Sequence, residues 1–339
     1  MKPVYVILLI FAPIVNSCYP VYKYHVGTFP EKPVNMENIN SEFDDYNSTA
    51  PTLGKTGPLC FSSNRESYGK DFDIVYMLLD VIMSKSTGIL TVDENNRYNF
   101  DIYAANLNLN DAVSRVNTGN DELGPYLIPQ GNGHIKVENG NLNYQNYIML
   151  YAANESGNLD IKLTQNLTNR TYSIPQNIVF LNSLKDDAYP ALTSDSSEIY
   201  FCSNRDTNFD IYRTEIIKKS DLLSALSDSA PRSVIKVGLL SSDQDDKCPF
   251  IIGNLMVFAS NRSGGYGGFD LYYSIFTNNS WSAPVNFGEK INTQYDEYRP
   301  IVKVFEVDFT NDFMIFSSNR PGGNGGFDLY YAGIDKMTD

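Results

Sequence analysis

The chain has 339 residues and a composition, rich in Gly, Asn, Ser, Asp and Pro, that favours short strands joined by turns over long helices. Its formal net charge of -14 excludes the basic footprint on which nucleic-acid binding depends. The length suffices for one large all-β domain with a substantial core.

An export signal is predicted at the start of the chain. Lys2 precedes an apolar run at 4–15, which is shorter than the roughly 20 residues that a membrane-spanning helix needs. The letters VNSC at 15–18 resemble a bacterial lipobox, in which Cys18 becomes the lipidated first residue of the mature chain. An ordinary signal peptide with an incidental cysteine is the alternative. We expect a signal peptide of the lipoprotein type at 1–17.

The rest of the chain is expected to form a short linker and one folded domain. The linker covers 18–28, after the lipidated cysteine, and the folded domain covers 29–339. Three more cysteines are too few, and odd in number, for a disulfide framework, so buried thiols are expected. They are Cys60, Cys202 and Cys248.

A recurring motif is the strongest signal in the sequence, because self-similarity of this kind decides the fold. An aromatic residue, two small residues, Asn and Arg lead through a turn into Phe-Asp-Ile or Phe-Asp-Leu. The copies are FSSNRESYGKDFDIVY at Phe61, FCSNRDTNFDIY at Phe201, FASNRSGGYGGFDLYY at Phe258 and FSSNRPGGNGGFDLYY at Phe316. A weaker copy at Tyr151 keeps Asn154 and Asp160 but has Glu155 in place of Arg.

A pair of acids precedes each copy of the motif. The pairs are Asp44-Asp45, Asp121-Glu122, Asp186-Asp187, Asp245-Asp246 and Asp296-Glu297. In four units a proline follows three residues after the second acid, and in the first unit it is displaced to Pro51 or Pro58. Each unit is long enough for the four strands of a propeller blade.

Each unit can be divided into four strands. The first starts at the proline (189–192), the second runs into Asn-Arg (198–202), the third is Phe-Asp-Ile/Leu-Tyr and the fourth is a looser segment (281–286). The last unit lacks its own fourth strand, but FPEKPVNMENINSEFDDY from Phe29 matches WSAPVNFGEKINTQYDEY from Trp281. The N-terminal segment is therefore expected to complete the last blade, which closes the ring and removes exposed strand edges.

The expected fold is thus all-β, a single β-propeller of five four-stranded blades. A sixth blade stays open as a possibility because Phe-Asp-Ile occurs at 72–74 and again at 100–102. The repetition indicates either an inserted hairpin or a partial extra blade, and the stretch involved is 75–99.

The repeated unit resembles the WD-like repeat of TolB-type β-propellers. The resemblance rests on the acid pair, the Asn-Arg turn and Phe-Asp-Leu-Tyr as they stand at 245–273 and 296–331. The resemblance covers nearly all of the chain from Phe29. It implies a lipoprotein of the bacterial envelope. TolB itself has six blades and a second domain, which the five units found here do not match.

Alternating connections are expected to bring the acid pairs and the Asn-Arg turns to one rim of the ring. A guanidinium holds a carboxylate through two hydrogen bonds, so we expect a structural brace repeated in each blade. Its members are Arg65, Arg205, Arg262 and Arg320, the five acid pairs, and Asp73, Asp210, Asp270 and Asp328. The alternative is a rim that binds cations or an amine-bearing ligand, although no copy has the spacing of a known calcium loop.

Because the repeat accounts for the conspicuous acids, no catalytic residue, metal or cofactor is expected, and the sequence names no ligand-binding residue. The expected function is that of a non-catalytic scaffold, not an enzyme, which binds envelope proteins or glycans. The protein is expected to be a monomer that is held at the outer membrane by its lipid alone. The alternatives are a glycan-binding module, whose aromatic rings would stack on sugars, and a five-bladed glycoside hydrolase with its acids at the ring centre.

Overall fold

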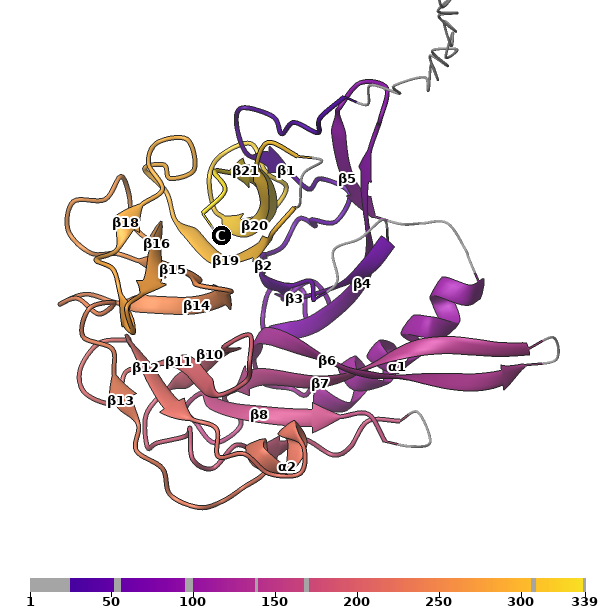
Figure 1. Ribbon diagram of the computed structural model, residues 1–339, viewed down its shortest axis with the longest axis vertical. Coiled ribbons are helices and arrows are strands. Elements are labelled where there is room, and N and C mark those ends of the chain that lie inside the picture. The colour runs from indigo at the N-terminus through magenta and orange to yellow at the C-terminus, as the bar shows by residue number, and fades with distance from the viewer. Residues whose placement is uncertain are drawn as a thin grey trace, which may run out of the picture.

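Five antiparallel sheets arranged around one axis form a five-bladed β-propeller (Figure 1). The predicted all-β fold with four-stranded blades is confirmed, and the described part of the chain contains five blades rather than six. The computed structural model describes residues 25–51, 56–94, 100–137, 140–167, 171–305 and 309–337.

The innermost strand of each blade lines the axis and packs against the innermost strands of its two neighbours, so the ring is closed. Each of these strands begins at the second acid of a pair, not at the proline as expected. The proline lies instead in a β-bulge that interrupts the strand, where a missing N–H costs no ladder hydrogen bond. The innermost strands are β2 (Asp45–Thr49), β6 (Glu122–Val137), β10 (Asp187–Leu192), β14 (Asp246–Ile252) and β19 (Glu297–Lys303).

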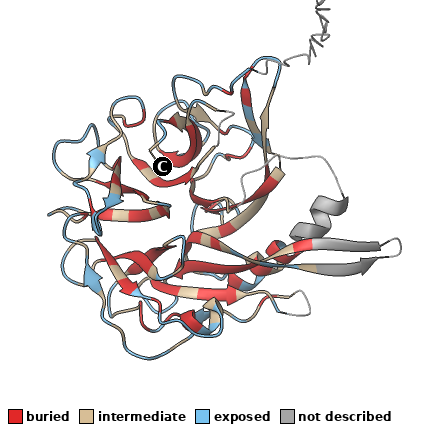
Figure 2. Cartoon of the chain, in the orientation of Figure 1, coloured by how far each residue is buried: buried red, intermediate tan, exposed pale blue. Residues whose placement is uncertain are grey.

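The two middle strands of each blade carry the hydrophobic core (Figure 2). Because successive side chains of a strand point to opposite faces, Phe313 and Ile315 pack toward the first blade while Met314 and Phe316 pack toward the fourth. The second strands are β3 (Thr56–Ser63), β7 (Gly140–Ala153), β11 (Glu198–Ser203), β15 (Leu255–Ser260) and β20 (Asp312–Ser318). The third strands are β4 (Asp73–Met83), β8 (Asp160–Gln165), β12 (Asp210–Glu215), β16 (Asp270–Thr277) and β21 (Asp328–Ile334).

The outermost strands are short, and one of them comes from the N-terminal segment. In β1 (Val34–Asn35), Val34 pairs with Tyr331 and Asn35 with Tyr330 of β21, which confirms the predicted closure. The matching segment of the fourth blade, β18 (Val285–Asn286), pairs with β16 in the same way. The other outer strands are β5 (Leu90–Glu94), β9 (Gln176–Asn177), β13 (Ile235–Lys236) and β17 (Ser280–Trp281).

The described part of the stretch 75–99, residues 75–94, belongs to the first blade, and 95–99 lie outside the described residues. Strand β4 continues to Met83 and turns into β5, so these residues form a hairpin of the first blade and not a strand of a sixth blade. The second Phe-Asp-Ile, at 100–102, begins the helix α1 (Phe100–Val116) and is not a strand of a further blade. Buried residues Leu109, Ala112 and Val116 of this helix pack in the cluster between the first two blades. A short helix, α2 (Leu222–Leu226), covers the outside of the ring further along the chain.

Candidate functional site

Four of the five blades hold an arginine against the second acid of the pair. In each, the guanidinium Nη2 lies 2.5 to 3.0 Å from the carboxylate and 2.7 to 2.8 Å from a backbone carbonyl of the preceding turn. The guanidinium carbon lies 5.1 to 5.2 Å from the centre of the Phe ring that opens the motif. The acids are fully buried. The pairs are Arg65 with Asp45, Arg205 with Asp187, Arg262 with Asp246 and Arg320 with Glu297.

The first acid of each pair connects two neighbouring blades and does not contact the arginine. Asp296 accepts a hydrogen bond from the backbone N–H of Phe269 in the blade before it (2.8 Å) and one from the Asn319 side chain in its own blade (2.9 Å). Asp44 accepts from the N–H of Phe327 in the same way, across the point where the ring closes. Asp121, Asp186 and Asp245 accept from the N–H groups of Phe72, Leu159 and Phe209.

The acid of the Phe-Asp-Ile/Leu motif also lies away from the arginine. Asp328 accepts from the backbone N–H groups of Asn324 and Gly325, and so holds its own glycine-rich turn. A side chain at Gly323 would collide with this carboxylate, which explains the glycine. Asp270 accepts from the equivalent N–H groups, whereas Asp210 forms an ion pair with Lys236 at 2.5 Å. The Asp73 carboxylate forms no hydrogen bond with another side chain or backbone group in the described ranges.

The second blade lacks the brace. Glu155 replaces the arginine, and its carboxylate pairs instead with Lys162 at 2.6 Å. The buried acid Glu122 accepts hydrogen bonds from the N–H and hydroxyl of Thr118 (3.0 and 2.7 Å) and has no cationic partner in the described part of the chain. Burial raises the pKa of Glu122 to about 7, and the negative charges of Asp73 and Glu155 add to the shift.

The ring centre holds no carboxylate at the positions where the bulges point inward. These five equivalent positions directly precede the proline or, in the first blade, Ser48. Their residues are Asn47, Gly124, Tyr189, Cys248 and Arg299. The acids that the glycoside-hydrolase alternative places at the ring centre are therefore not found at these positions.

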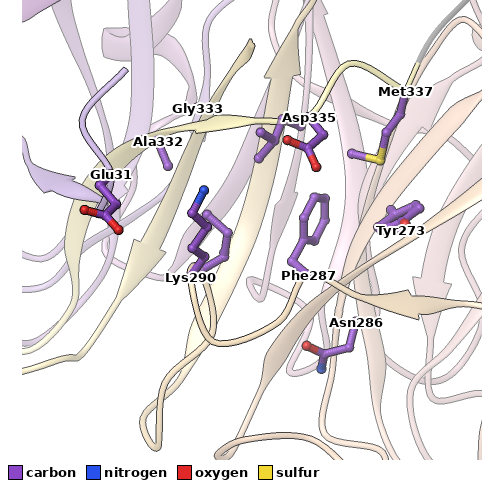
Figure 3. A pocket seen from close by; sticks show the side chains of 11 residues that line it. Glu31, Tyr273, Asn286, Phe287, Lys290, Ala332, Gly333, Asp335 and Met337 are labelled. Atoms are coloured by element: carbon purple, nitrogen blue, oxygen red, sulfur yellow. The ribbon is translucent and has the colours of Figure 1, made fainter. Parts of the chain in front are cut away.

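A pocket of about 360 Å³ lies between the fourth and fifth blades, beside the segment that closes the ring (Figure 3). Tyr273 enters it from β16, and Phe287 and Lys290 from the turn after β18. Asp335 follows β21, and Glu31 precedes β1. The two ends of the propeller domain and the fourth blade thus build the pocket together.

The pocket combines aromatic faces with polar groups that are free to bind a ligand. The half-buried rings of Tyr273 and Phe287 lie 5.1 Å apart at an angle of 56°. Glu31, Lys290 and Asp335 are exposed and form no hydrogen bond or ion pair with another described residue. In the view of Figure 3 the ammonium of Lys290 lies between the two carboxylates. A few polar groups around an apolar floor are typical of small-molecule sites.

Sequence reasoning missed this pocket, because its residues lie outside the repeated motif. Glu31 and Asp335 are separated by almost the whole chain and line the same pocket because β1 pairs with β21. Arg299 was missed for another reason. An alignment of the repeats at the residue before the proline would have shown a charged side chain where the other units have Gly, Tyr, Cys and Asn.

The remaining candidate chemistries find no support. Cys60, Cys202 and Cys248 are buried free thiols, as expected, and burial raises the pKa of each, so they are poor nucleophiles. The described ranges contain no cluster of His, Cys, Asp or Glu suited to a metal ion. Nor does any described helix have the length and apolar character needed to cross a membrane. Cys18 and the segment 1–17 lie outside the described residues.

Comparisons with known proteins find relatives only among solved structures. No protein-family model matches the chain, and no curated protein matches it. A thermostable family-43 glycoside hydrolase is 12% identical and has a TM-score of 0.49, covering 85% of this chain and 88% of its own. A glycosyl hydrolase from Bacteroides ovatus is 10% identical with a TM-score of 0.47, covering 93% and 95%. A GH130 protein, described with hydrolases that target β-1,2 mannosidic linkages, is 8% identical with a TM-score of 0.48, covering 94% and 97%.

These structures correct three expectations. Several of the propellers that resemble the chain are described as glycoside hydrolases, which contradicts the TolB-type assignment, the non-catalytic scaffold and the expectation that the chain is not an enzyme. At such low identity the likeness itself extends to the fold alone. The activity must therefore be inferred from the chain's own residues.

Proposed function

We propose that this chain is a carbohydrate-active propeller that binds a saccharide in the pocket between the fourth and fifth blades and hydrolyses a glycosidic bond there. The observation that carries the proposal is the pairing of two carboxylates with two half-buried aromatic rings in one pocket. Sugar rings present apolar C–H faces that pack on aromatic rings, and hydroxyl groups that bind carboxylates and ammonium groups.

The chemistry proposed for the pocket is that of a carboxyl pair. Glycoside hydrolysis needs one carboxyl group that protonates the departing oxygen, and a second that attacks the anomeric carbon or deprotonates a water molecule. Glu31 and Asp335 are the two carboxylates of the pocket, and they come from opposite ends of the propeller domain. Lys290 binds hydroxyl groups of the sugar and orients it between them.

A measurement of saccharide binding tests the role of the aromatic rings of Tyr273 and Phe287. Phe287→Ala should weaken saccharide binding about fivefold, because stacking on a ring contributes about 1 kcal/mol. A panel of oligosaccharides, measured by calorimetry with the wild-type protein, would identify the ligand first. Tyr266→Ala is the matched control, because this half-exposed ring lies in a glycine-rich turn outside the pocket. Equal loss in both variants would contradict the assignment of the site.

A measurement of the hydrolysis rate tests the catalytic role of the Glu31 and Asp335 carboxylates. Glu31→Gln and Asp335→Asn should each lower the release of reducing ends from the bound saccharide by at least about a hundredfold, the typical contribution of a general acid or base. Saccharide affinity should change only a few-fold. Glu289→Gln, on the same turn as Lys290 but outside this pocket, should remain active. Unchanged turnover in both pocket variants would refute the hydrolytic role.

We further propose that the protein is exported and that a lipid on Cys18 holds it at the bacterial outer membrane as a monomer. The support is the signal-like segment at 1–17 followed by the lipobox-like VNSC. Envelope glycans are then the substrates within reach.

A further inference from the structure

A second polar centre lies on the axis of the propeller. The five residues at the bulges of the innermost strands all adopt positive φ angles, between 45° and 59°. At each bulge the innermost strand has one residue more than the strand that it pairs with, and this turns one side chain out of the regular alternation. The residues concerned are Asn47, Gly124, Tyr189, Cys248 and Arg299.

These side chains meet one another across the ring. The Arg299 guanidinium carbon lies 5.4 Å from the centre of the Tyr189 ring, and the Tyr189 hydroxyl lies 3.4 Å from Asn47 Nδ2. A side chain on Gly124 would collide with the Tyr189 ring, so the second blade contributes only backbone here. Cys248 adjoins Arg299, whose charge opposes the rise that burial causes in the thiol pKa. All five blades therefore contribute to one sealed cluster.

Arg299 is left with unused donors in this cluster. Its side chain is 1% exposed, and its one hydrogen bond runs from Nη2 to the carbonyl of Pro125 at 3.3 Å. Nε and Nη1 have no partner, and neither does Oδ1 of Asn47. A buried guanidinium normally faces a carboxylate, because an uncompensated buried charge is strongly destabilising.

The nearby carboxylates are used elsewhere. The second acids of the first, third, fourth and fifth innermost strands bind the brace arginines, and Glu122 binds Thr118. Arg299 forms no ion pair within the described ranges. The side chains whose pKa values Arg299 affects are neutral phenols and thiols, all able to donate a hydrogen bond: Tyr126, Tyr189, Cys202 and Cys248. The axis is therefore positively charged and rich in donors.

We infer that the propeller axis is a binding site for a small monovalent anion, a halide such as chloride, held by Nε and Nη1 of Arg299. The anion neutralises the one buried charge of the cluster and ties the five innermost strands together. A small ion suits the site because the surrounding side chains are almost completely buried. The site is separate from the pocket of Figure 3 and does not depend on the proposed hydrolytic activity.

Thermal unfolding at equal ionic strength tests the site. Sodium chloride and sodium bromide should raise the Tm of the wild-type protein by several degrees relative to sodium gluconate, because a ligand bound only by the folded state stabilises it. Arg299→Gln should abolish the difference between salts. Arg205→Gln is the matched control: it removes a partly buried arginine that already faces a buried carboxylate, so it should lower the Tm but keep the chloride effect.

Crystals grown with bromide give a measurement that does not depend on the stability of the variants. Anomalous scattering should show a bromide beside Nε and Nη1 of Arg299 in the wild-type protein. A wild-type Tm that is the same in all three salts, or an axis without an anomalous peak, would overturn the inference. A water molecule at the same place would be one such result.

Discussion

At the scale of single residues, Glu122 shows what a change in a repeated contact costs. Its counterparts Asp45, Asp187, Asp246 and Glu297 each face a guanidinium, which supplies an opposite charge. The second blade keeps the buried acid without the arginine, so the charged form of Glu122 is disfavoured. Burial raises the pKa of Glu122 to about 7, so this carboxyl group titrates near neutral pH.

The pKa of Glu122 predicts a pH-dependent stability. Its value in the folded state, about 7, exceeds the ordinary 4.5, so the folded protein binds the proton more tightly and loses stability as pH rises from about 4.5 through 7. The loss amounts to at most about 3 kcal/mol. Glu122→Gln should remove this contribution and be more stable than the wild type at pH 8, as urea unfolding across this range would show.

The equivalent change in the fifth blade is the control for this prediction. Glu297→Gln leaves Arg320 without its carboxylate and should destabilise the protein at the same pH. If Glu122→Gln also lowers the free energy of unfolding at pH 8, Glu122 is not an uncompensated charge.

At the scale of elements, the pairing of β1 with β21 decides whether the last blade is complete. Asn35 of β1 donates a hydrogen bond to Asp328 of β21 at 2.8 Å, and Asn286 of β18 donates one of the same length to Asp270. The same short sequence, Pro-Val-Asn, therefore forms the same edge contact in two blades. In one the contact is local, and in the other it joins the two ends of the propeller domain.

Asn35→Ala should therefore have a wider effect than Asn286→Ala. Each substitution removes one side-chain hydrogen bond, which contributes about 1 kcal/mol. In Asn35→Ala, hydrogen exchange should quicken in both β1 and β21, because the bond connects distant parts of the chain. In Asn286→Ala the change should stay within the fourth blade. Confinement of both effects to the mutated strand would contradict a role for β1 in holding the ring closed.

At the scale of the whole molecule, the ring separates functions in space. The brace and the contacts of the first acids stabilise one rim, Arg299 lies on the axis, and the candidate saccharide pocket lies between two blades. Cys18, the proposed site of the lipid, precedes the propeller in the sequence.

Cys18→Ala should move the full-length protein from the membrane fraction to the soluble fraction, because the lipid would be its sole anchor. Fractionation of cells followed by detection of the protein measures this. His25→Ala, in the segment after the lipobox, is the control and should stay with the membrane. A Cys18→Ala protein that remains in the membrane fraction would refute the lipid anchor.

The sequence by itself indicated five blades, with a sixth left open, and identified the strand that closes the ring. The motif recurs once in each of the five units, and Pro-Val-Asn at 33–35 is repeated at 284–286. The sequence also marked the acids and arginines of the rim, but it did not separate the acids that face an arginine from those that bind the preceding blade. That distinction depends on which oxygen faces which donor, and only the folded chain sets it.

Only the tertiary structure decided where the sites that break the five-fold pattern lie. Glu31 and Asp335 line one pocket because β1 pairs with β21, and Arg299 reaches the axis because a bulge turns it inward. Glu31 and Asp335 are remote from each other in the sequence, and Arg299 is rotated out of the alternation of its strand. Neither arrangement produces a periodic pattern in the sequence. The repeats therefore reveal the architecture, while the individual residues that differ among them carry the proposed functions.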